Sequence, residues 1–122
     1  MHPAKPSRRT LLLSLPTLAV ARPAQAHAVL LDSFPLPNGT MPAGPGQLRL
    51  RFNSRIDVGR SRFTLRTPDN REAALALKPG ATADIVLADV IIAPGKHVIA
   101  WQVLAVDGHI TRGVVAFMAI AA

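Results

Sequence analysis

Two side chains near the end of the chain have the chemistry and the spacing of a small polar site. Asp107 and His109 flank Gly108, so a carboxylate and an imidazole lie two residues apart. Asp-Gly is a dipeptide typical of β-hairpin turns, and here it separates two apolar runs, 95–106 and 110–120. The sequence therefore predicts that the pair lies at the mouth of a hairpin, where it is either a ligand site or a solvated turn.

Residues 1–26 have the organisation of an export signal. Basic residues precede an apolar run over 11–21, and Ala24-Gln25-Ala26 supplies the small residues that signal peptidase accepts. The run is too short to span a bilayer comfortably as a permanent anchor, and an uncleaved anchor is the remaining alternative. The pair Arg8-Arg9 fits a twin-arginine signal as well as an ordinary one. We predict a cleaved signal peptide and one mature domain over 27–122.

Cleavage after Ala26 would make His27 the first residue of the mature protein. Its free α-amine and its imidazole Nδ1 can then chelate one metal ion, whereas the uncleaved amide nitrogen is a poor ligand. If His27 meets the hairpin, His27, Asp107 and His109 supply three nitrogens and a carboxylate. Such a set suits Cu(II) best, while Zn(II) would need the same donors in a tetrahedron. Asp107 would bind the metal axially, or it would orient a ligating imidazole without binding the metal itself.

The elements that must position these residues are short β-strands. Alternating apolar and polar residues and frequent Pro/Gly turns predict about seven strands and no helix, at 28–33, 47–53, 60–67, 73–77, 85–87, 96–106 and 110–120. The Pro/Gly-rich stretch 34–46 is expected to be a connection. This pattern predicts an immunoglobulin-like Greek-key β-sandwich with Trp101 in its core, and a small barrel is the alternative.

Composition excludes several classes of function. The chain carries 14 basic and 7 acidic residues, and four of the basic ones precede residue 27, so the mature domain has 10 against 7, a net charge of only +3. With no Tyr and no basic cluster among aromatics, nucleic-acid binding is not expected. The absence of Cys excludes disulfides and thiolate metal sites.

At these residues the sequence resembles the CopC family of periplasmic copper-binding proteins. The shared features are the His that follows the export signal, Ser33-Phe34-Pro35 with Gly39, the stretch from Pro45 to Phe52, and a terminal signature at Gly95, Trp101, Val103, Asp107, Gly108, His109, Gly113 and Phe117. The resemblance implies a periplasmic β-sandwich that binds one Cu(II) through the amine and imidazole of His27 with His109 and Asp107. It also implies a monomer that is not an enzyme and that acts in copper homeostasis or resistance, with an inner-membrane copper transporter of the CopD type as partner.

Some positions depart from the family pattern. His97 stands where the family usually has Tyr, and Arg55 stands where many members have a Glu that approaches Cu(II), with Asp57 a weak substitute. Members that also bind Cu(I) carry a Met-rich loop, whereas the mature chain has only Met41 and Met118, far apart in sequence. We therefore predict one Cu(II) site and no Cu(I) site.

Two other functions stay open at this point. A histidine brace is also the copper site of oxidative polysaccharide-cleaving monooxygenases, although this chain lacks an aromatic platform for a polysaccharide. The sandwich could also be a metal-free docking module. His97 is expected to be a core residue rather than a ligand, and the strand arginines 49, 51, 62 and 66 are expected to form a solvated face or to dock an acidic partner.

Overall fold

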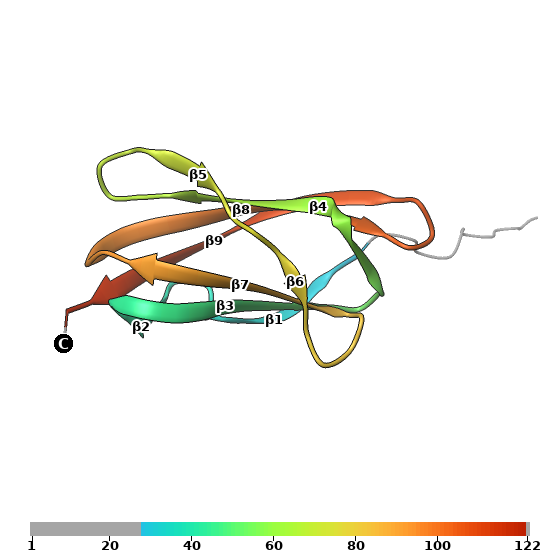
Figure 1. Cartoon of the computed structure of the whole chain (residues 1–122), viewed down its shortest axis with the longest axis horizontal. Helices are drawn as coiled ribbons and strands as arrows, with labels where there is room; N and C mark the ends of the chain where they lie inside the picture. The colour runs from blue at the N-terminus through green and yellow to red at the C-terminus, as the bar shows by residue number, and fades with distance from the viewer. Residues whose placement is uncertain (1–27, 122) are drawn as a thin grey trace, which may run out of the picture.

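The computed structural model describes residues 28–121, which fold into nine β-strands in two sheets. The strands are β1 (Leu30–Phe34), β2 (Gly39–Pro42), β3 (Gly44–Phe52), β4 (Ile56–Arg66), β5 (Glu72–Ala74), β6 (Lys78–Pro79), β7 (Ile85–Ile92), β8 (Gly95–Ala105) and β9 (Ile110–Ile120). One sheet has the order β1-β3-β7-β6 and the other β2-β9-β8-β4-β5. The two sheets lie face to face (Figure 1), which confirms the predicted sandwich and excludes the barrel.

Strict alternation along the long strands builds the core. In β3, Leu48, Leu50 and Phe52 are fully buried while Arg49 and Arg51 point outward, as the sequence predicted. From the opposite sheet, Trp101 is 7% exposed and meets Phe52 edge-on, with ring centroids 5.1 Å apart. Because successive strand residues point to opposite faces, each sheet presents one apolar face to the other, and burial of that apolar surface is the main stabilising term.

The strand boundaries correct the prediction in several places. The stretch 34–46 is not merely a connection, because β2 pairs in parallel with the end of β9. Lys78-Pro79, which lies between the strands predicted at 73–77 and 85–87, forms β6 on the edge beside β7. The strand expected at 85–87 extends to Ile92, and the one expected at 73–77 shrinks to β5. The prolines misled the prediction because edge strands and strand ends tolerate a missing N–H.

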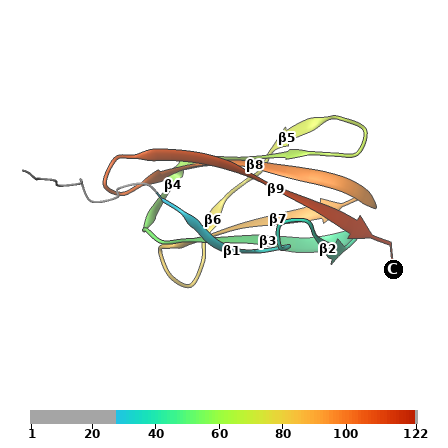
Figure 2. The same ribbon diagram turned by 180° about the vertical axis from the view of Figure 1, so that it is seen from behind.

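The chain enters and leaves the sandwich at opposite ends. Figures 1 and 2 show that the start of the described chain lies beside the β8–β9 hairpin, whereas the end of β9 lies at the far end next to β2. Within residues 28–121 no helix is long and apolar enough to span a bilayer. Asp107 and His109, the two predicted site residues that the structure describes, lie in the turn of this hairpin.

Candidate metal centre

The β8–β9 hairpin confirms the predicted turn at Asp107-Gly108. Pairing between the strands runs from Gly95↔Ala119 to Leu104↔Ile110, and Ala105 N–H then donates to the carbonyl of His109 over 2.9 Å. Gly108 takes a φ of 99°, whereas Asp107 does not adopt a positive φ. The connection is thus longer than a two-residue turn, and its left-handed position falls on the residue that has no Cβ to resist it.

Asp107 and His109 lie against each other within this turn. Asp107 Oδ1 accepts a hydrogen bond from His109 N–H over 3.2 Å and lies 3.3 Å from His109 Nδ1. The side chains are 45% and 50% exposed, respectively, so the pair is on the surface. The backbone N–H of His109, helped by its imidazole, outweighs the opposing effect of desolvation and lowers the pKa of the Asp107 carboxyl. Asp107 is therefore a carboxylate at neutral pH.

This geometry defines which imidazole nitrogen of His109 is suited to a metal. A carboxylate only accepts hydrogen bonds, so the nitrogen that faces Asp107, Nδ1, is the one that carries the proton. Nε2 then has the lone pair that a metal uses, and the carboxylate sets the ring orientation, as in many metal-bound histidines. Of the two roles considered for Asp107, this arrangement favours the orienting one.

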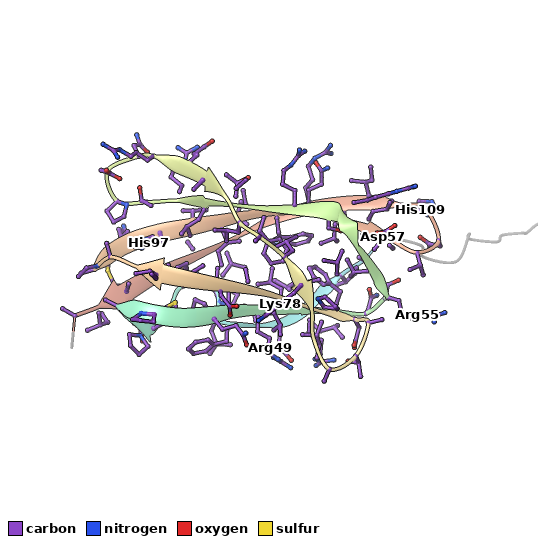
Figure 3. The ribbon with its side chains drawn as sticks, viewed as in Figure 1. Arg49, Arg55, Asp57, Lys78, His97 and His109 are labelled. Atoms are coloured by element: carbon purple, nitrogen blue, oxygen red, sulfur yellow. The ribbon has the colours of Figure 1, made fainter. Side chains whose placement is uncertain are left out.

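The turn between β3 and β4 lies next to the hairpin. Val106 N–H donates to the carbonyl of Arg55 over 3.0 Å, and Asp57 pairs with Leu104 across β4 and β8. Figure 3 shows Asp57 and His109 at the same end of the sandwich, with the Arg55 side chain extending away from it. Asp57 lies 3.8 Å from Arg60 Nε. Arg55 therefore contributes its backbone carbonyl to the hairpin, and the carboxylate nearest to it in the chain is that of Asp57.

The first residues that the structure describes also lie at the hairpin end of the sandwich. Ala28 is 1% exposed, and its N–H donates to Thr111 Oγ1 over 3.2 Å. Val29 N–H donates to Asn53 Oδ1 over 2.8 Å, and Asn53 N–H returns a bond of 3.0 Å to the carbonyl of Val29. His27, the predicted chelating residue, lies outside the described residues.

His97 lies at the opposite end of the sandwich from His109 (Figure 3). It is 2% exposed, its Nδ1 is 3.0 Å from the carbonyl of Gly95, and its ring stacks on Phe117 at 5.3 Å. Met41, expected to pack in a loop, is instead a core residue at 4% exposure. Neither residue is placed where it could join Asp107 and His109. Among residues 28–121 no group of three or more His, Asp or Glu could hold a metal ion.

The strand arginines are largely engaged in ion pairs with neighbouring acids. Arg49 and Arg51 both bind the carboxylate of Asp32, at 2.9 and 2.8 Å, and Arg66 binds Glu72 at 2.6 Å. The Arg51 hydrogen bond, followed by that of Arg49, lowers the pKa of Asp32 despite some desolvation. These pairs are on the surface, where such contacts add little stability, and they support the prediction of a solvated charged face.

The chain has counterparts among known proteins in both sequence and fold. The CopC domain family matches residues 30–119. Protein YobA of Escherichia coli K12 is 30% identical over 112 residues, which cover 88% of this chain and 90% of that protein. The crystal structure of CopC from Methylosinus trichosporium OB3b has a TM-score of 0.70 at 23% identity, and covers 78% of this chain and 95% of that one.

A further similar crystal structure is that of PcoC, a methionine-rich copper resistance protein from Escherichia coli. It has a TM-score of 0.62 at 22% identity, over 78% of this chain and 100% of PcoC. The likeness to these structures confirms the fold. The extent of the family match shows that the chain belongs to the CopC domain family.

Two residues whose side chains bind the first described amides, those of Ala28 and Val29, were not predicted from the sequence. Thr111 and Asn53 carry no motif of their own, and they lie 83 and 24 positions from the residues whose amides they bind. The only available signal is weak: a hydroxyl stands at an inward position of β9 where an aliphatic residue is expected.

Proposed function

We propose that this chain is a periplasmic copper-binding protein that sequesters or delivers copper through a single Cu(II) site. The proposed ligands are the α-amine and imidazole of His27 and Nε2 of His109, with Asp107 orienting the second imidazole or binding axially. The observation that carries the proposal is that an exposed carboxylate–imidazole pair and the first described residue, which binds Thr111, lie at the same end of the sandwich. No catalytic step is assigned.

The chemistry of the donor set supports this proposal. The pair Asp107 and His109 offers one nitrogen and one carboxylate, which do not complete a Cu(II) coordination sphere by themselves. Ala28, the residue that follows His27 in the chain, lies at the same end of the sandwich. Two nitrogens from His27 would bring the set to three nitrogens, the kind of field that Cu(II) prefers.

Sulfur ligands are not part of the proposal. Met41 is buried in the core, and Met118 lies on β9, where its neighbours Phe117 and Ala119 face inward and it does not. Cu(I) is bound best by soft thiolate and thioether ligands, so we propose no Cu(I) site. The proposed partner, an inner-membrane transporter of the CopD type, and the monomeric state rest on the family resemblance alone.

The decisive experiment is a Cu(II) titration of protein processed to begin at His27, followed by electron paramagnetic resonance. We expect one equivalent to bind with an axial, nitrogen-rich spectrum. His27→Ala and His109→Ala should each weaken binding sharply, whereas His97→Phe, a matched control that removes a buried histidine at the other end, should leave it unchanged. Wild-type affinity in either site variant would refute the proposed ligand set.

A second measurement separates the carrier from the enzyme. One residue added before His27 should weaken binding because it converts the amine ligand into an amide. With reductant and a polysaccharide, the copper-loaded protein should show no copper-dependent oxidation of the substrate. Turnover in that assay would favour the histidine-brace monooxygenase, and absence of stoichiometric binding in the titration would leave the metal-free docking module.

A further inference from the structure

The side chain of Thr111 binds the first residue that the structure describes, Ala28, to the five-stranded sheet. Ala28 immediately precedes β1, which belongs to the four-stranded sheet, but its N–H donates to Thr111 Oγ1 over 3.2 Å on β9 of the five-stranded sheet. The Ala28 side chain is buried at 1% exposure. This bond therefore crosses between the sheets at the end that holds Asp107 and His109.

Thr111 breaks the pattern of its own strand. The inward positions of β9 from 113 onward carry Gly113, Val115, Phe117 and Ala119, and Thr111 continues this row opposite the fully buried Val103. A hydroxyl at such a position needs a partner, because burying an unpaired polar group is costly. The partner that the structure provides is the amide of Ala28.

Asn53, in the β3–β4 turn, makes two hydrogen bonds with the next residue, Val29. Its side-chain oxygen accepts the N–H of Val29 and its own N–H donates to the carbonyl of Val29, at 2.8 and 3.0 Å. The dipeptide Ala28-Val29 is thus held between the β3–β4 turn and β9. Chain ends that lack such bonds open at almost no free-energy cost, so these bonds decide whether the first residues stay at this end.

We infer that Thr111 is a positioning residue for the copper site: its hydroxyl fixes the residue bonded to His27 beside the hairpin that presents His109. The inference rests on the proposed function, since it concerns the ligands named there. Thr111 lies on β9, two residues after His109 in the turn, so the hairpin that presents the imidazole ligand would also fix the chain that supplies the amine. Without the hydroxyl, the first residues would spend more time away from the hairpin, and the apparent affinity would fall by the fraction displaced.

The test compares Thr111→Val with Thr111→Ser in protein processed to begin at His27. Valine has nearly the shape of threonine and removes only the hydroxyl, whereas serine keeps it. Thr64→Val, on the outward side of β4, is the matched control. Backbone 15N relaxation at Ala28 and Val29 in the metal-free protein reports the anchoring, and competitive Cu(II) titration reports the affinity. Thr111→Val should loosen both amides and weaken Cu(II) binding by roughly ten-fold, the loss expected when one partly buried amide loses its partner.

The outcomes separate this inference from the proposed function. Wild-type behaviour of Thr111→Ser and Thr64→Val beside weakened Thr111→Val would support the positioning role. Unchanged relaxation and unchanged affinity in Thr111→Val would overturn it, and so would loosened amides with unchanged affinity. If the wild-type protein binds no Cu(II), the proposed function fails instead, and the role of Thr111 at the metal site falls with it.

Discussion

Gly113 offers the sharpest test of side-chain packing in this sandwich. A Cβ added at this position would lie 2.3 Å from Cζ2 and 2.6 Å from Cε2 of Trp101. Carbon atoms in contact prefer about 3.5–4.0 Å, so the indole would have to move by more than about 1 Å. It has little room to do so, because Trp101 is 7% exposed and packs edge-on against Phe52.

Overpacking of this kind costs about 1–3 kcal/mol, and the short approach to a rigid buried ring places Gly113→Ala at the upper end, about 3 kcal/mol. For a domain of this size each kcal/mol lowers the Tm by about 4–8 °C, so a fall of more than about 10 °C is expected. Urea unfolding followed by circular dichroism measures the free energy directly.

Two variants show whether the indole is the cause. Gly59→Ala is the matched control on β4, because its added Cβ would meet only Asp57 Oδ1, at 3.6 Å, and its stability should stay within about 0.5 kcal/mol of wild type. In the double variant Gly113→Ala/Trp101→Phe the smaller ring should make room for the methyl group. The combined loss should then be at least about 1 kcal/mol smaller than the sum of the single losses. Strict additivity, or a Gly113→Ala domain as stable as wild type, would refute the packing argument.

Two further predictions concern polar groups. His97→Phe keeps an aromatic ring stacked on Phe117 and removes a buried Nε2 that has no hydrogen-bond partner within residues 28–121. Because the substitution also loses the Nδ1 bond to Gly95, we expect urea unfolding to show a free energy of unfolding equal to that of wild type or up to about 2 kcal/mol higher. A free energy of unfolding lower than that of wild type by more than about 1 kcal/mol would contradict this. Asp32 has its pKa lowered, first by the Arg51 hydrogen bond, so its contribution is present above the ordinary carboxyl pKa of about 3.9 and is lost as the pH falls through the lower folded value. Asp32→Asn should therefore show a flatter decline of Tm below about pH 4 than wild type, and parallel curves would count against the ion pairs.

Much of the architecture was predictable because it depends on local pattern. The alternation of Leu48, Leu50 and Phe52 with two arginines defines which face of β3 is buried, and the same period of two made β8 and β9 a predictable hairpin around Asp107-Gly108. Side-chain direction in a strand follows from backbone geometry alone. The proposed ligands at the hairpin and the predicted cleavage likewise come from single stretches of sequence.

The tertiary structure decided which distant residues meet. Nothing local indicated that Gly39–Pro42 would pair in parallel with β9, or that the Arg55 carbonyl would hold the hairpin at Val106. The bond from Ala28 to Thr111 spans 83 positions and two sheets. Such contacts depend on how the sheets pack and on which buried amides then need partners. The sequence by itself therefore determined the chemistry available to this protein, while packing between the sheets determined where that chemistry is assembled.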